Sequence, residues 1–152
     1  MKLTTKGKFA VIALLDMAVL SQDNDTPITL LSISERQAIS LSYLEQLFVK
    51  LRRSELVKSY KGPGGGYILA NPLTDIKISA IIKAVNDDMD ARTCHGLKNC
   101  GTGNHKCLTH DLWSGLTNHI YDYLDKITLH DLVCKANLAK GNRINIIHTK
   151  AS

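Results

Sequence analysis

Hydrophobic residues recur at helical spacing in three stretches near the start of the chain, and each stretch predicts a helix. The first, over residues 5–21, is apolar on such a broad face that neighbouring elements should bury it on several sides. The second, over 30–37, is short and has Thr29 as a suitable N-cap. A tight turn at 38–40 leads to the third, over 41–54. Two short helices joined by a three-residue turn are the helix-turn-helix arrangement.

The segment that follows these helices has the order strand, turn, strand. Residues 56–61 and 67–70 predict the two strands, and the glycine-rich residues 62–66 predict the turn between them. A hairpin directly after a helix-turn-helix is a wing. At the start of the third helix, Ser42 and Glu45 have the S-x-x-E spacing of a capping box.

The second half of the chain has helical periodicity on both sides of a stretch that has none. Residues 76–86 predict one helix, 109–126 a longer one and 128–138 a short last one. Residues 91–108 hold three glycines and three cysteines without periodicity, so we expect a loop there. Residues 139–152 are expected to form a loose tail.

These elements predict a mainly α protein with a small β-hairpin. We expect a winged helix-turn-helix over 1–75, a cysteine-bearing loop with dimerisation helices over 76–138, and the tail over 139–152. The helix over 109–126 carries a strip of apolar residues at four-residue spacing, namely Leu112, Leu116, Ile120 and Leu124. That strip suits an intrachain core or a two-fold dimer, and a dimer would place two recognition helices one turn of DNA, about 34 Å, apart.

Basic residues outnumber acidic ones by 19 to 14, and the net charge of +5 favours a polyanion as partner. The excess is concentrated between Lys50 and Lys61, where Glu55 is the only acidic residue. The third helix and the wing therefore predict a double-stranded DNA partner, with a solvated face and a flexible hairpin as the alternative. The candidate DNA-binding residues are Thr4, Lys6, Ser40, Ser42, Tyr43, Glu45, Gln46, Lys50, Arg53, Lys61, Gly62, Pro63 and Gly64.

Four candidate metal ligands follow one another with glycines between them, which let the backbone bring thiolates together: Cys94, Cys100, Cys107 and His110. The gaps are longer than the short cysteine pairs of structural zinc sites and suit a bulkier iron–sulfur cluster, but spacing alone leaves zinc open. His95 and His105, in the same loop, are alternative ligands. Cys134 lies beside Leu132 and Val133 on a predicted helix, which favours a buried thiol.

No stretch of the sequence approaches the roughly 20 apolar residues of a membrane span. Asp16 interrupts the apolar run 9–20, so a buried helix is a better interpretation of that run than a signal peptide. We therefore expect a cytoplasmic protein without a membrane partner, whose cysteines are metal ligands or thiols rather than disulfides. No arrangement of nucleophile and base indicates catalysis, so we expect neither an enzyme nor a small-molecule substrate.

Several motifs in combination resemble the IscR family of iron–sulfur-cluster-sensing transcription regulators. The resemblance spans residues 1–135 and is carried by Met1-Lys-Leu-Thr-Thr-Lys-Gly7, Ile33-Ser-Glu-Arg-Gln37, Ile39-Ser-Leu-Ser-Tyr-Leu-Glu-Gln-Leu-Phe48, Lys61-Gly-Pro-Gly-Gly-Gly-Tyr67 and Cys107-Leu-Thr-His110. It implies a homodimeric winged helix that binds a 2Fe–2S cluster through Cys94, Cys100, Cys107 and His110. It also implies two classes of DNA site, one of which needs the cluster, and Glu45 as the residue that tells them apart.

The sequence departs from the family pattern in two places. The gap between Cys100 and Cys107 is one residue longer, and Ala38 replaces the usual glycine of the turn. A left-handed alanine there would add about 1 kcal/mol of strain. Related regulators that sense nitric oxide take a carboxylate from the first helix as fourth ligand. Here that region offers Lys6 and Lys8, so His110 favours the IscR type.

The predicted function is a DNA-binding transcription regulator, a repressor or an activator, that senses iron–sulfur cluster status and controls cluster assembly genes. It would act as a homodimer on an operator, and the cluster-assembly machinery would supply the 2Fe–2S cluster. Three alternatives stay open: a zinc-binding regulator, a regulator with another cluster that senses redox state or nitric oxide, and a metal or cluster carrier protein.

Overall fold

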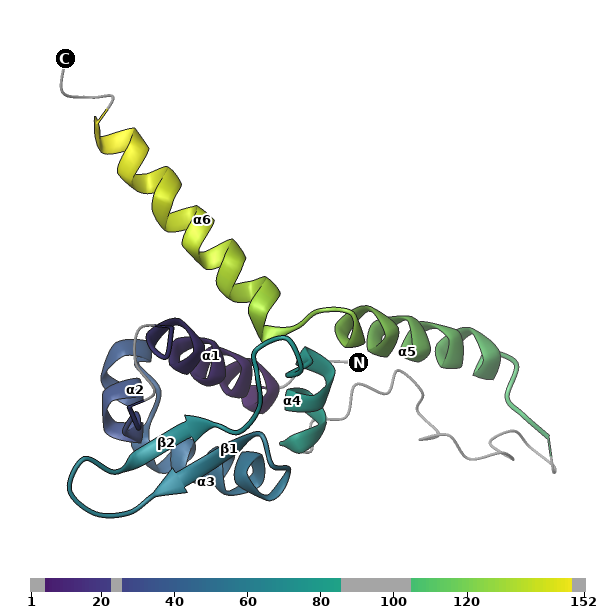
Figure 1. Ribbon diagram of the computed structural model, residues 1–152. Helices are drawn as coiled ribbons and strands as arrows, with labels where there is room; N and C mark the ends of the chain where they lie inside the picture. The colour runs from purple at the N-terminus through teal and green to yellow at the C-terminus, as the bar shows by residue number, and fades with distance from the viewer. Residues whose placement is uncertain (1–4, 23–25, 86–104, 149–152) are drawn as a thin grey trace.

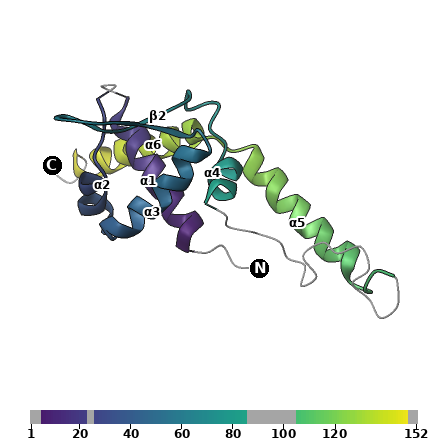
Figure 2. The same cartoon turned by 90° about the horizontal axis from the view of Figure 1, so that it is seen from below.

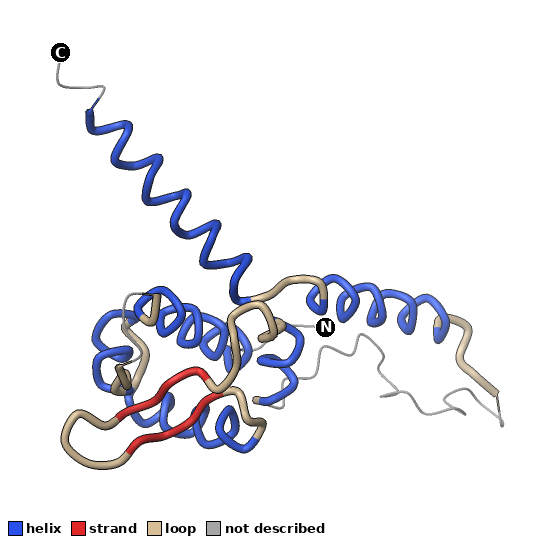
Figure 3. Tube along the Cα trace, viewed as in Figure 1, coloured by secondary structure: helices blue, strands red, loops and turns tan. Residues whose placement is uncertain are grey.

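The computed structural model describes residues 5–22, 26–85 and 105–148, without the side chains of 140–148. Within these ranges the chain is mainly helical with one antiparallel hairpin, which confirms the predicted fold class (Figures 1 and 3). The elements in chain order are α1 (Thr5–Leu20), α2 (Leu30–Gln37), α3 (Leu41–Arg53), β1 (Val57–Tyr60), β2 (Gly66–Leu69), α4 (Ile78–Ala84), α5 (His110–Asp125) and α6 (Leu129–His148).

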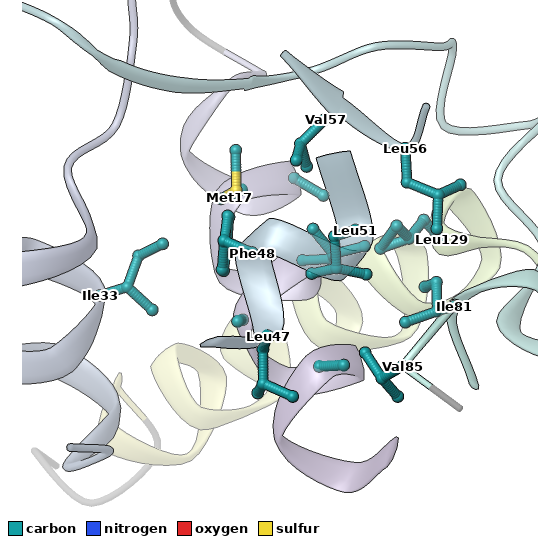
Figure 4. Packing of buried hydrophobic residues seen from close by; sticks show 14 of the residues in the cluster. Met17, Ile33, Leu47, Phe48, Leu51, Leu56, Val57, Ile81, Val85 and Leu129 are labelled. Carbon is teal, nitrogen blue, oxygen red and sulfur yellow. The ribbon is translucent and has the colours of Figure 1, made fainter. Parts of the chain in front are cut away.

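Helix α1 lies at the centre of the body and contacts α2, α3, α4, α6 and β2, as its broad apolar face predicts. Its buried side chains include Leu14 and Met17 and are otherwise small, so the neighbouring helices approach closely. Phe48 of α3 is fully buried in the same cluster, with Leu51 beside it (Figure 4). The winged-helix body therefore closes around one hydrophobic core.

The turn between α2 and α3 has the strained residue that the sequence indicates. Ala38 is left-handed, with φ 53° and ψ 43°, where the strain on an alanine is about 1 kcal/mol. The hydroxyl of Ser34 donates to the carbonyl oxygen of Ile39 at 2.6 Å and helps to hold the turn. At the other end of α2 the side chain of Thr29 accepts from the backbone N–H of Ser32, which confirms the predicted cap.

The predicted capping box at the start of α3 is wrong. The helix begins at Leu41 with Ser40 as N-cap, and no side chain caps it. Ser42 therefore lies inside the first turn, where its hydroxyl is 3.1 Å from that of Ser40. Glu45 lies a full turn further on, too far along the helix to reach back to the N-cap. Its exposed carboxylate is not used as a cap.

The wing is fastened to the body by a third segment of chain. Strand β1 pairs with β2 from Val57 opposite Leu69 to Tyr60 opposite Gly66. Ile28 then pairs with Tyr67 through two hydrogen bonds of 2.8 Å. A Cβ at Gly66 would lie 2.5 Å from the carbonyl oxygen of Ile28, so only glycine permits this approach.

Helices α5 and α6 leave the body in different directions, as two arms (Figures 1 and 2). The junction between them is tied to the segment before α4: Ile78 N–H donates to Ile127, Leu129 N–H to Ile76 and His130 N–H to Leu73. Beyond this junction only the first turns of α6 contribute to the core, through Leu129 and Val133.

Helix α6 is longer than the sequence predicts. It runs to His148, through residues assigned to a loose tail, so the prediction of a short helix with a tail from 139 is wrong up to that point. No proline follows residue 138, and a glycine such as Gly141 disfavours a helix by only about 1 kcal/mol. None of the described helices is long and apolar enough to cross a membrane.

Candidate nucleic-acid interface and metal centre

The outward face of α3 carries residues three or four positions apart, which share one side of a helix. Ser42, Gln46 and Arg53, all selected from the sequence, are exposed on this face, opposite the buried stripe of Leu44, Leu47, Phe48 and Leu51. Val49 lies among them and is 38% exposed. The sequence analysis missed it because it selected polar side chains, although helical spacing places Val49 on the same face. Amide, hydroxyl and guanidinium groups can bond base edges, and a valine can contact a thymine methyl group.

The two flanks of α3 differ. Tyr43 and Lys50, seven residues apart, are half-buried on one flank. The ring of Tyr43 meets Phe9 of α1 edge-on at 5.8 Å, and the ammonium of Lys50 donates to the carbonyl oxygen of Val85 at 3.3 Å. Glu45 lies on the other flank and is exposed. Lys50 is therefore engaged within the protein rather than directed outward like Arg53.

The tip of the wing is open to solvent. Its four candidate residues, Lys61, Gly62, Pro63 and Gly64, are all exposed. Gly62 and Gly64 have φ values of 96° and 74°, which residues with a Cβ rarely adopt, and a Cβ added at either would point into open space. Exposed backbone beside a lysine is suited to approach a phosphate. Tyr60, 51% exposed on β1, is a further candidate that the sequence analysis did not select.

The remaining DNA-binding candidates lie around the start of α3. Ser40 is exposed immediately before that helix, and Lys6 is exposed in the first turn of α1. Because Phe9 of α1 contacts Tyr43, that first turn lies next to α3. Thr4 lies outside the described residues. Helix α3, the wing tip and the start of α1 thus offer exposed polar and basic groups for a duplex.

The structure describes two of the four candidate metal ligands. Cys107 and His110 lie within one turn at the start of α5, where the backbone N–H of His110 donates to the carbonyl of Cys107 at 3.0 Å. Cys107 is half-buried and His110 is 8% exposed. Cys94 and Cys100 lie outside the described residues, and those that are described include no group of three or more metal-ligating side chains.

The donors at the start of α5 fit an iron–sulfur cluster. A thiolate and an imidazole three residues apart, in the turn that leads into α5, can bind the same centre, and both donor types occur in such clusters. The same pair also suits zinc, so the described geometry leaves that choice where the spacing left it. Of the two alternative histidine ligands, His105 is exposed and His95 lies outside the described residues.

Asp16 is not available as a metal ligand. Its carboxylate accepts from Arg36 at 2.7 Å and from the side-chain amide of Gln37 at 2.6 Å, and its side chain is only 7% exposed. The hydrogen bond to Asp16 raises the pKa of Arg36. Asp16 therefore joins α1 to α2 within the helix-turn-helix.

The prediction that Cys134 is buried is wrong. Leu129 and Val133 form the buried stripe of α6, and Cys134, one residue further round the helix, is exposed. Its sulfur lies 3.8 Å from Nε2 of His130, one turn earlier. An apolar neighbour in sequence did not reveal which face of the helix the thiol occupies.

The chain is similar in sequence and in fold to known transcriptional regulators. A family described as Rrf2, iron-dependent transcriptional regulator, matches residues 3–135. The chain is 52% identical over 133 residues to the HTH-type transcriptional regulator IscR of Yersinia pseudotuberculosis, covering 88% of this chain and 79% of that one. The structure of T. potens IscR superposes with a TM-score of 0.74 at 37% identity, over 91% and 90% of the two chains. CymR, the global cysteine regulator of B. subtilis, superposes at 0.73 with 27% identity, over 89% and 98%.

Proposed function

The chain belongs to the Rrf2 family of transcriptional regulators, and from this premise we propose that it is a homodimeric, cytoplasmic regulator that senses iron–sulfur cluster status and controls cluster assembly genes. Its relatives are transcription regulators and not enzymes. The observation that carries the proposal is the Cys107–His110 pair at the start of α5, on the same chain as an exposed recognition helix and wing.

DNA recognition is assigned to three surfaces. Helix α3 enters the major groove, where Gln46 and Arg53 reach base edges or phosphates and Val49 meets thymine methyl groups. The wing tip, with Lys61, and the start of α1, with Lys6, contact the phosphate backbone. These charge contacts provide affinity that falls with salt, while α3 provides the choice of sequence.

Dimerisation is assigned to α5. Leu112 is 64% exposed and Trp113 is 40% exposed on an arm that leaves the body. Leu116 and Ile120 continue the strip toward the junction and are half-buried. An apolar strip that no described part of its own chain covers favours a second copy of the same helix, and a two-fold pairing also gives two recognition helices in matching orientation.

The cluster is assigned to Cys94, Cys100, Cys107 and His110, and the cluster-assembly machinery is its donor. When bound, a 2Fe–2S cluster supplies a redox-active and exchangeable prosthetic group. Neutral imidazole is a weaker donor to iron than thiolate, so His110 makes the site easier to empty than a four-cysteine site. DNA sites that prefer the cluster-bound protein then gain affinity with occupancy.

Glu45 is assigned the discrimination between two classes of operator. Its carboxylate is exposed on one flank of α3 and is not a helix cap. Near DNA it repels phosphates and accepts only from a donor such as cytosine N4, so it penalises some sequences. We expect Glu45→Ala to let the cluster-free protein bind operators that otherwise need the cluster.

Anaerobic purification tests the proposal directly. A visible absorption spectrum with iron and acid-labile sulfide in equal amounts identifies the cluster, whereas zinc without sulfide supports a zinc-binding regulator. Selection of binding sites from random duplexes with loaded and cluster-free protein then shows whether an operator is recognised. A loaded protein that selects no sequence would instead be a carrier, and that result would overturn the regulatory role.

A further inference from the structure

The side chain of Lys50 on α3 forms a hydrogen bond within the protein, which a contact with DNA would not require. Its ammonium donates to the carbonyl oxygen of Val85 at 3.3 Å, across 35 positions of sequence, and the side chain is half-buried. Val85 is the C-cap residue of α4 and is fully buried. The last carbonyls of a helix lack partners within it and carry the negative end of its dipole. A lysine at this end therefore binds α3 to the end of α4.

The apolar contact around this hydrogen bond makes the two helices move together. Leu47 and Leu51 on α3 are buried in the same cluster as Ile81 and Val85 on α4 (Figure 4). Closely packed side chains transmit a small displacement rather than absorbing it. A shift of the end of α4 is therefore passed to the recognition helix.

The beginning of α4 is fixed to the other functional arm. Lys77, its N-cap, and Ser79 in its first turn both donate to the carboxylate of Asp125, the last residue of α5. These bonds lower the pKa of Asp125, that from Ser79 contributing most. Further along α4, the ammonium of Lys83 lies 5.0 Å from the ring centre of Tyr121 on α5. Helix α4 therefore stands between α5, which begins with the ligand His110, and α3.

We infer that Lys50 is the positioning residue that couples the metal centre to the recognition helix. Val85 precedes the segment that carries Cys94 and Cys100, and the opposite end of α4 is held by α5. A group bound at His110 thus acts on α4 through α5, and Lys50 makes the angle of α3 follow. This inference rests on the proposed function, and it assigns Lys50 to regulation rather than to a phosphate.

The test compares two basic residues on the same helix. Lys50→Met keeps an apolar stem of similar length and removes the donor, while the matched control Arg53→Met removes a charge from the outward face. Affinity for a cluster-requiring operator is measured for loaded and cluster-free protein over a range of salt concentrations. Lys50→Arg, which keeps the charge and the donors, serves as the rescue variant, and thermal melting checks that each variant is folded.

The two roles predict opposite patterns. For Lys50→Met we expect the ratio of loaded to cluster-free affinity to fall about fivefold or more, with an unchanged slope of log affinity against log salt. For Arg53→Met we expect the ratio of loaded to cluster-free affinity to remain unchanged. The slope of log affinity against log salt should flatten by about 0.9 for each phosphate that the protein no longer neutralises. A flattened slope with an unchanged ratio in Lys50→Met overturns the inference. If loaded and cluster-free wild-type protein bind the operator with equal affinity, the proposed function itself fails. A wild-type difference that Lys50→Met leaves unchanged overturns only the inference about Lys50. A Lys50→Met protein that does not fold moves the comparison to Lys50→Arg, whose failure to keep the wild-type ratio would count against the inference.

Discussion

The winged-helix body and the α5 arm are built on different principles. Apart from Leu129 and Val133 at the start of α6, every buried hydrophobic residue of the described chain lies before residue 86. Helix α5 instead buries His110 and Thr117 and leaves Leu112 and Tyr123 largely exposed. The body therefore gains its stability from its own core, whereas the arm begins with the proposed metal ligand His110 and carries an exposed apolar strip.

This contrast implies that changes in the two regions have different consequences. A substitution that shortens a buried side chain of the body destabilises the fold, and DNA binding is lost with the fold. A substitution in the α5 arm should keep the fold intact and alter dimer assembly or cluster binding.

The largest effect is expected for Phe48→Ala. Phe48 is fully buried, and its ring packs against that of Tyr67 on the wing with 4.9 Å between the ring centres. Its loss should lower the free energy of unfolding by about 3–5 kcal/mol, measured by urea denaturation. The adjacent Val49→Ala should change it by less than about 0.5 kcal/mol, because Val49 faces outward. Equal losses from the two variants would contradict the placement of the core and of the DNA-facing side.

The next effect is expected for Leu112→Asp on α5. A carboxylate within a two-fold apolar strip is buried without a partner, so the proposed dimer should dissociate while the body stays folded. Sedimentation equilibrium should report a monomer, and affinity for a palindromic operator should fall about 100-fold or more, since bivalent binding is lost. Asn118→Asp, on the same helix and exposed away from the strip, is the charge control. A Leu112→Asp protein that remains dimeric would assign the interface elsewhere.

Removal of the His110 imidazole should affect cluster binding and leave the winged-helix body unchanged. His110→Ala should lose most of its cluster, measured by the visible spectrum and by iron content, and should keep cluster-independent DNA binding because the body is intact. His110→Cys should retain a cluster and release it less readily under iron limitation, because thiolate is the stronger donor. His105→Ala is the matched control, since His105 is exposed in the same stretch. Full occupancy in His110→Ala would move the fourth ligand to another residue.

The sequence predicted the helices of the body, the wing and α5 better than α6, and the reason is physical. The helices and the wing follow from local periodicity, and the cap at Thr29 and the left-handed turn at Ala38 depend on neighbouring residues. The α3 capping box failed although its spacing fits, because the chain begins the helix at Leu41 and leaves Ser42 within the first turn. A short motif establishes what is possible, and the start of the element decides whether it forms.

Long-range contacts set the features that local patterns could not give. The contact of Lys50 with Val85 joins residues that no periodicity relates, so a basic residue on α3 was assigned to DNA by its charge alone. The exposure of Cys134 depends on which face of α6 meets the body, and that face is fixed by Leu129 and Val133. The ligand set stays a prediction from residue type and spacing, and the structure describes Cys107 and His110 of it.

The smallest effect is expected at the start of α6, where the structure shows a capping box that the sequence analysis did not identify. The carboxylate of Asp131 accepts from the backbone N–H and the hydroxyl of Thr128, both at 2.9 Å, and Thr128 accepts in return from the N–H of Asp131. The backbone hydrogen bond from Thr128 is the main cause of a lowered pKa of Asp131. Because the folded-state pKa lies below the unfolded value, the stabilisation is complete above about pH 4 and disappears as the pH falls through the folded-state pKa. Asp131→Asn should therefore speed hydrogen exchange in the first turn of α6 at neutral pH and approach the wild type in acid. Asp122→Asn, which removes a carboxylate from an exposed position of α5, controls for net charge and should leave that exchange unchanged. A difference from the wild type that persists unchanged in acid would mean that the carboxylate does not cap the helix.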